Sequence, residues 1–91
     1  MFRYSIKISG IVQGIGYRYF VSNRAKKLDI TGWVKNLDTG EVEINAEGTD
    51  DKLEIFVHVI KTNHPWAQIK NVEIIKFEIQ ERLSDNFVVT V

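Results

Sequence analysis

The stretch from Gly10 to Arg18 combines residue types that bind an anion. It reads Gly-Ile-Val-Gln-Gly-Ile-Gly-Tyr-Arg and lies between an alternating apolar segment and a helix-like segment. Gly14 and Gly16 have no Cβ, so the loop can take positive φ angles and turn successive backbone N–H groups toward one point. N–H groups arranged in this way beside the start of a helix form an anion site.

Arg18 indicates which kind of anion. It is predicted to lie in the first turn of the following helix, where a cation faces the positive end of the helix dipole at a cost of roughly 0.3–1 kcal/mol. A phosphate-like anion between the guanidinium and the N–H groups would remove that cost. The alternative is a tight turn without a ligand. The loop is too short for a G-x-x-x-x-G-K-S/T phosphate loop and lacks the third glycine of a dinucleotide-binding fingerprint.

Asn36 is the second candidate for chemistry. It closes the segment Gly32-Trp33-Val34-Lys35-Asn36, late in a predicted strand. Its amide has one acceptor and two donors, so it can position a water molecule without carrying charge. At the end of a sheet it could approach the glycine loop. The alternative is an ordinary turn residue, because Asp38-Thr39-Gly40 follows directly.

Alternation and helical spacing predict the elements that flank these residues. Residues 2–8 alternate apolar and polar side chains, which is typical of a half-buried strand. Residues 17–28 carry an apolar stripe at helical spacing. Residues 30–37 and 41–47 are predicted to form a hairpin across the turn signal Asp38-Thr39-Gly40.

Three further elements complete the chain. A helix is predicted from about Asp50 until shortly before Pro65, and residues 72–80 and 87–91 are predicted strands. The apolar phase shifts at Ile74-Ile75, which predicts a bulge or a strand covered on both faces. The order is β-α-β-β-α-β with a short extra C-terminal strand. It predicts an α+β, ferredoxin-like two-layer sandwich, an antiparallel sheet with two helices on one face.

Composition restricts the function classes. Twelve basic residues balance twelve acidic ones, so neither a nucleic acid nor a membrane surface is indicated as a partner. There are no cysteines, which excludes disulfides and thiolate chemistry. No apolar run approaches the ~20 residues that span a bilayer. The sequence therefore predicts one domain over residues 1–91, with the cytoplasm as its default location.

Other polar residues are interpreted as structural. His58 and His64 have no Ser or Asp partner at a catalytic spacing, and no cluster of metal ligands is present. The acidic residues of 41–47 alternate on one face of the hairpin, where they are predicted to be solvated. The same strand lacks the aromatic residues of an RNA-recognition motif.

The two segments together, Gly10-x-Val12-Gln13-Gly14-Ile15-Gly16-Tyr17-Arg18 and Gly32-Trp33-Val34-Lys35-Asn36, resemble those of the acylphosphatases. The resemblance covers nearly the whole chain. It implies hydrolysis of the carboxyl–phosphate anhydride of a small acyl phosphate, without a metal or other cofactor, by a monomer.

The resemblance also implies the roles of individual residues. Arg18 would bind the phosphate and take part in catalysis, and Asn36 would position the attacking water. The backbone cradle for the phosphate would run over Gln13, Gly14, Ile15, Gly16, Tyr17 and Arg18. Tyr17 stands where the family usually has phenylalanine.

Two other functions stay open from the sequence. One is a non-catalytic ferredoxin-like module that binds an anion or a nucleic acid. The other is an acylphosphatase-like domain of the hydrogenase-maturation carbamoyltransferase type, which Tyr19-Phe20-Val21 loosely resembles.

Overall fold

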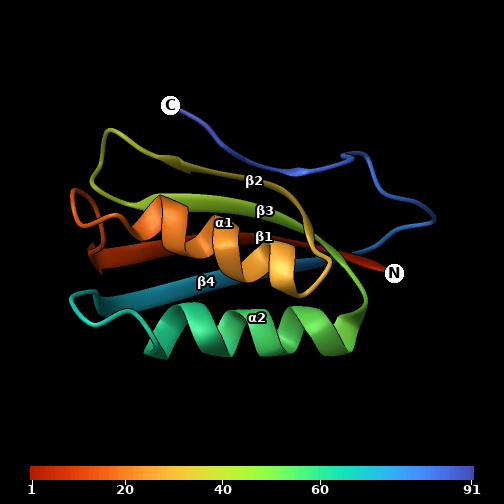
Figure 1. Ribbon diagram of the computed structural model, residues 1–91, viewed down its shortest axis with the longest axis horizontal. Helices are drawn as coiled ribbons and strands as arrows, with labels where there is room; N and C mark the ends of the chain where they lie inside the picture. Colours follow the sequence, from red (N-terminus) through yellow and green to blue (C-terminus); the bar gives the residue numbers. More distant parts are fainter.

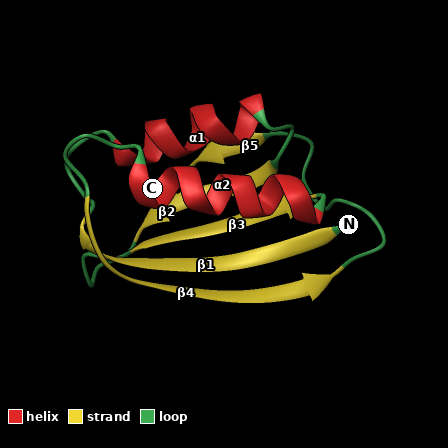
Figure 2. Ribbon diagram, turned by 90° about the horizontal axis from the view of Figure 1, so that it is seen from below, coloured by secondary structure: helices red, strands yellow, loops and turns green.

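The computed structural model describes residues 1–91 and contains five strands and two helices. In chain order these are β1 (Phe2–Ile11), α1 (Tyr17–Lys27), β2 (Thr31–Asn36), β3 (Val42–Gly48), α2 (Asp50–Thr62), β4 (Gln68–Glu78) and β5 (Phe87–Val89). The strands form one sheet (Figure 1). Both helices cover the same face of it, which makes two layers (Figure 2). The predicted ferredoxin-like sandwich is confirmed.

The sheet has the order β4-β1-β3-β2-β5. β1 pairs antiparallel with β3 and β4, and β2 pairs antiparallel with β3. The three residues of β5 pair parallel with β2. Because β1 runs antiparallel to β3 and β3 antiparallel to β2, β1 and β2 point the same way. The loop after β1 and the last residue of β2 therefore meet at one end of the sheet.

Alternation in the strands and the apolar stripes of the helices produce a single buried cluster. It contains 17 apolar residues between the sheet and the two helices. On β1 the buried residues are Tyr4, Ile6 and Ile8, as the period of two predicts. α2 forms despite its β-branched residues, because Leu53, Phe56, Val57 and Ile60 share one buried face.

The predicted irregularity in the last long strand lies elsewhere. β4 begins at Gln68, four residues before the predicted start, and its register against β1 shifts beside Ser9 and Gly10. No shift occurs at Ile74-Ile75. Ile74 packs against the core, whereas Ile75 is 61% exposed on the open face of the sheet. The prediction of a bulge or of double coverage at this point is wrong, because an apolar residue simply faces solvent there.

Glu47 also departs from the prediction of a solvated acidic face. Its side chain belongs to the open face of the sheet, yet the residue is only 1% exposed. The loop between β4 and β5 covers it, and the backbone N–H groups of Leu83 and Ser84 donate to its carboxylate at 3.0 and 3.1 Å. The nearby Arg82 donates to Thr31 Oγ1 at 3.1 Å. Glu47 therefore ties this loop to the sheet.

Candidate active site

The loop between β1 and α1 presents unpaired N–H donors. Gly14 and Gly16 have φ angles of 76° and 74°, the left-handed region that glycine enters without steric cost. Gly16 is the N-cap of α1, no side chain caps this end of the helix, and no acidic residue lies in its first turn. The first N–H groups of a helix have no carbonyl partner within it. They are therefore free to bind an anion.

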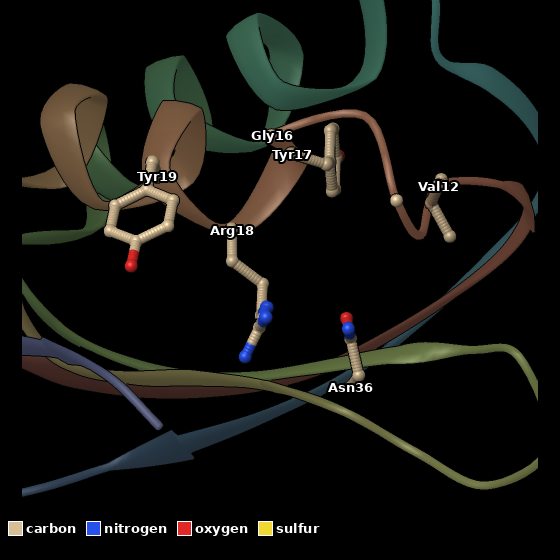
Figure 3. A pocket seen from close by; sticks show the side chains of 7 residues that line it. Val12, Gly16, Tyr17, Arg18, Tyr19 and Asn36 are labelled. Atoms are coloured by element: carbon tan, nitrogen blue, oxygen red, sulfur yellow. The ribbon is translucent and has the colours of Figure 1, made fainter. Parts of the chain in front are cut away.

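A cavity of about 130 Å³ lies at this helix end. It is lined by Val12, Gly14, Gly16, Tyr17, Arg18, Tyr19 and Asn36 (Figure 3). Arg18 is the only charged residue among them, so no carboxylate opposes an anion in the cavity. Ligand pockets for larger molecules measure about 300–1,000 Å³. This cavity is therefore suited to a small anionic group.

The C-terminal segment holds the guanidinium of Arg18. One Nη1–H of Arg18 donates to the backbone carbonyl of Thr90 at 2.7 Å, and the N–H of Thr90 donates to the carbonyl of Val34 on β2. A guanidinium has five N–H donors, so this bond leaves donors free to form a bidentate contact with an oxyanion. The contact thus fixes the direction of the side chain without using up its binding capacity.

Asn36 extends from β2 toward the loop (Figure 3). It lies two residues after the buried Val34 and therefore on the face of the sheet that carries the helices. Its Oδ1 atom is buried and has no hydrogen-bond partner in the protein. A buried acceptor without a partner costs about 1–3 kcal/mol. Such a group is accounted for when it binds a ligand or a water molecule in the cavity.

The structure thus brings Arg18, Asn36 and both loop glycines to one cavity, and it places the side chains of Gln13 and Ile15 outside that cavity. The side-chain amide of Gln13 donates to the carbonyls of Leu37 and Glu41, both at 2.9 Å. Gln13 therefore fastens the loop to the turn that follows Asn36, and only its backbone N–H is available to an anion. The side chain of Ile15 packs against the core.

Tyr17 contributes to the site through its backbone. Its side chain is 1% exposed, and its hydroxyl donates to the carbonyl of Ile60 on α2 at 2.7 Å. Burial raises the pKa of this phenol, which keeps the hydroxyl protonated as a donor. Tyrosine in place of phenylalanine therefore keeps the ring in the core and adds a bond between the two helices.

Sequence reasoning missed Thr90 and Tyr19. Thr90 acts through its carbonyl, 72 positions from Arg18, and no residue type signals a backbone contact. Tyr19 could have been noticed, because it is a large aromatic residue directly after Arg18 on the polar side of the helical stripe. It is 67% exposed and lines the cavity.

No group of three or more His, Cys, Asp or Glu side chains is arranged to hold a metal ion. No helix has the length and apolar character needed to cross a membrane.

Comparison with known proteins agrees with this geometry. The acylphosphatase family model matches residues 4–89. The acylphosphatase of Methanospirillum hungatei is 46% identical over 80 residues, which is 87% of this chain and 88% of that protein.

Solved structures give the same result. The crystal structure of acylphosphatase from Bacillus subtilis superposes with a TM-score of 0.94 at 37% identity, over 100% of both chains. Full-length HypF in its phosphate- and nucleotide-bound form matches all of this chain with a TM-score of 0.85 at 29% identity, over 12% of its own length. The family match over almost the whole sequence leads to one conclusion: this chain is a member of the acylphosphatase family.

Proposed function

We propose that this protein is an acylphosphatase, which hydrolyses an acyl phosphate to a carboxylate and inorganic phosphate. One observation carries the proposal: a single small cavity combines a guanidinium, free helix N–H groups and the buried, unpaired Oδ1 of Asn36. The first two bind a phosphoryl group, and the third binds water. Membership of the acylphosphatase family supports the assignment.

The loop and Arg18 bind the phosphoryl group of the substrate. Backbone N–H groups from Gln13 to Arg18 donate to its oxygens, and the free edge of the guanidinium makes a two-pronged contact. These donors are held in place before the substrate arrives, by Thr90 on one side and by the αL glycines on the other. Preorganised donors stabilise charge that redistributes over the phosphoryl oxygens in the transition state.

Asn36 holds the nucleophile. A water molecule donates one hydrogen to Asn36 Oδ1, which leaves its oxygen lone pair directed at phosphorus. The water oxygen bonds to phosphorus while the bond from phosphorus to the carboxyl oxygen breaks. The carboxylate leaves with that electron pair, and the products are a carboxylate and dihydrogen phosphate.

The reaction needs little more than positioning. A carboxylate is a good leaving group, and holding water and phosphorus in line replaces much of the entropic cost of their encounter. A phosphoryl oxygen accepts the proton of the water, so no side chain of adjusted pKa is required. We propose that the reaction needs no metal ion, because Arg18 and the N–H groups supply the positive charge.

A direct assay tests the proposal. Benzoyl phosphate loses ultraviolet absorbance on hydrolysis, so the purified protein is expected to turn it over, with the same rate after EDTA treatment. Absence of turnover above background would leave a non-catalytic binding module. Carbamoyl phosphate belongs in the same assay, because the sequence leaves open a domain of the hydrogenase-maturation carbamoyltransferase type as an alternative. A preference for carbamoyl phosphate of about 100-fold or more would favour a carbamoyl-phosphate-handling domain.

Replacing Arg18 by lysine tests whether the guanidinium in the cavity binds the phosphoryl group. A point charge cannot make the two-pronged contact, so we expect Arg18→Lys to lower kcat/KM by roughly 10²–10³-fold. Arg24→Lys is the matched control on the same helix, where the guanidinium lies over the ring of Phe20. It should keep the wild-type rate. Near wild-type kinetics in Arg18→Lys would contradict the role given to Arg18.

We propose in addition that the enzyme acts as a monomer in the cytoplasm. A single copy of the chain supplies Arg18, Asn36 and the glycine loop to the cavity, so the proposed mechanism needs no residue from a second copy. Light scattering is expected to give the mass of one chain, 10.5 kDa, in the active fraction. The cytoplasmic location follows the expectation from the sequence, and fractionation of cells tests it.

A further inference from the structure

The cavity at the helix end is too small for an acyl phosphate whose acyl group is large. Its volume of about 130 Å³ is well below the roughly 300 Å³ at which pockets for larger molecules begin. The inference that follows rests on the proposed function, in which this cavity holds the phosphoryl group. A large acyl group, such as benzoyl, then extends out of the cavity and lies against another part of the surface.

A second hollow adjoins the cavity and shares Tyr19 with it. It measures about 450 Å³ and lies between α1 and β5. Helix α1 contributes Tyr19, Ser22, Asn23 and Lys26 to it, and the opposite wall is formed by Asn86, Phe87, Val88 and Val89. Tyr19 is thus the wall between the two spaces, and a molecule that leaves the first passes over its ring to enter the second.

The spacing of the helix residues makes this hollow a continuous groove. Tyr19, Ser22, Asn23 and Lys26 lie at i, i+3, i+4 and i+7, which is one face of α1. From Tyr19 to Lys26 the helix rises about 10 Å. Lys26 is therefore on the same side of α1 as Tyr19, about two turns farther along the helix. No carboxylate lines the groove, and Lys26 is its only charged residue.

The in-line geometry of the reaction also places the acyl group on the side of this groove. Water and leaving group lie on opposite sides of phosphorus in an in-line reaction. Figure 3 shows Arg18 between Asn36 on one side and Tyr19 on the other. A water molecule at Asn36 therefore places the departing carboxylate on the side of Tyr19, at the entrance of the groove.

We propose that the groove between α1 and β5 is the binding site for the acyl group, with the exposed ring of Tyr19 as its platform. The ring packs against the acyl carbons next to the carboxyl group. Lys26 pairs with a second anionic group farther along the chain of the substrate. The groove thus favours acyl phosphates of dicarboxylic acids over small uncharged ones.

Tyr19→Ala tests the role of the aromatic ring through the ratio of the kcat/KM values for two substrates. Benzoyl phosphate reaches over Tyr19, whereas acetyl phosphate scarcely leaves the cavity. The ratio of their kcat/KM values is expected to fall roughly three- to tenfold in Tyr19→Ala, the size of an aromatic contact. Tyr19→Phe should restore the ratio, because it keeps the ring. A ratio that equals the wild-type value in Tyr19→Ala would overturn the role of Tyr19.

Lys26→Gln tests whether Lys26 pairs with the second anionic group of the substrate. Glutaryl phosphate carries a carboxylate three methylene groups from its acyl carbon. Its kcat/KM relative to that of acetyl phosphate should fall about three- to tenfold at low salt in Lys26→Gln, and the wild-type preference should weaken as salt rises. Lys27→Gln is the matched control: Lys27 is the next residue on α1, does not line the groove and carries the same charge. Equal effects of the two variants would overturn the pairing.

The two proposals fail in different ways. A wild-type protein that hydrolyses none of the three substrates refutes the proposed function. A wild-type protein that hydrolyses all three, with both ratios unchanged by Tyr19→Ala and Lys26→Gln, refutes the groove alone.

Discussion

Asn36 illustrates how much of this site depends on single atoms. Its side chain reaches the cavity only because it is on the same face of β2 as Val34, at the last residue of the strand. A shift of one residue in the register of β2 would turn the amide to the open face of the sheet. Gln13 opposes such a shift, because its side-chain amide donates to the carbonyls of Leu37 and Glu41, at the two ends of the turn that follows Asn36.

Replacing Asn36 by alanine is expected to affect turnover more than binding. The phosphoryl donors remain, so KM should change little, while kcat should fall by roughly 10²-fold because the water is no longer held. Steady-state kinetics with benzoyl phosphate measure both. Asn45→Ala, an amide on the open face of β3, should keep wild-type values. An effect on KM alone would make Asn36 a substrate-binding residue.

At the scale of the elements, the loop between β4 and β5, residues 79–86, supports the attachment of β5 to the sheet. β5 is only three residues long and pairs with β2 alone, so its attachment to the sheet depends on what precedes and follows it. Glu47 holds the preceding loop through two backbone N–H groups. The segment that follows carries the carbonyl of Thr90 that orients Arg18. The position of Arg18 in the active site therefore depends on how well residues 79–86 are held against the sheet.

Glu47→Ala should destabilise the protein by about 2–3 kcal/mol, because it removes the charged acceptor of the backbone N–H groups of Leu83 and Ser84. Urea unfolding followed by circular dichroism measures the change. Glu43→Ala is the control on the same strand face: it removes only an exposed ion pair with Lys35 at 3.6 Å, a contact that contributes about 0–1 kcal/mol. If the two variants lost equal stability, Glu47 would not anchor the loop.

Local patterns were enough to predict the elements but not the contacts between distant ones. α1 was predicted over residues 17–28 and spans Tyr17–Lys27, since its apolar stripe and basic end depend on neighbours in sequence. The meeting of Arg18 with Asn36 was expected from the predicted fold and from the resemblance of their two segments to those of the acylphosphatases. The burial of Glu47 was not, because a charged residue in an alternating strand is solvated unless a remote loop happens to cover it.

At the scale of the whole molecule, one core carries both helices and the sheet, and we propose that residues 1–91 unfold as one cooperative unit. Two tyrosines connect its layers. Tyr17 bonds α1 to α2, and the Tyr4 hydroxyl on β1 lies within hydrogen-bond distance of the carboxylates of Asp50 and Glu54 on α2. Burial raises the pKa of both phenols, and the neighbouring carboxylates add to the effect at Tyr4.

These raised pKa values predict a loss of stability in alkali. Below pH ~10, the ordinary pKa of tyrosine, the phenols are protonated in both states and stability is unaffected. Above it the unfolded chain releases protons that the folded one retains, so the free energy of unfolding falls by up to about 1.4 kcal/mol per pH unit for each phenol. Urea titrations between pH 9 and 11.5 should show a shallower fall in Tyr17→Phe. Equal slopes would contradict the prediction.

The left-handed conformation of Gly16, at the end of the loop before α1, restricts which residue can occupy this position. Gly16, with φ of 74° and ψ of 18°, has open space around the position of an added Cβ, so conformation rather than room restricts this position to glycine. The mirror image of alanine prefers that same backbone region. In a chain assembled by peptide ligation, D-alanine at position 16 is therefore expected to favour the backbone conformation of the N–H cradle, which L-alanine disfavours.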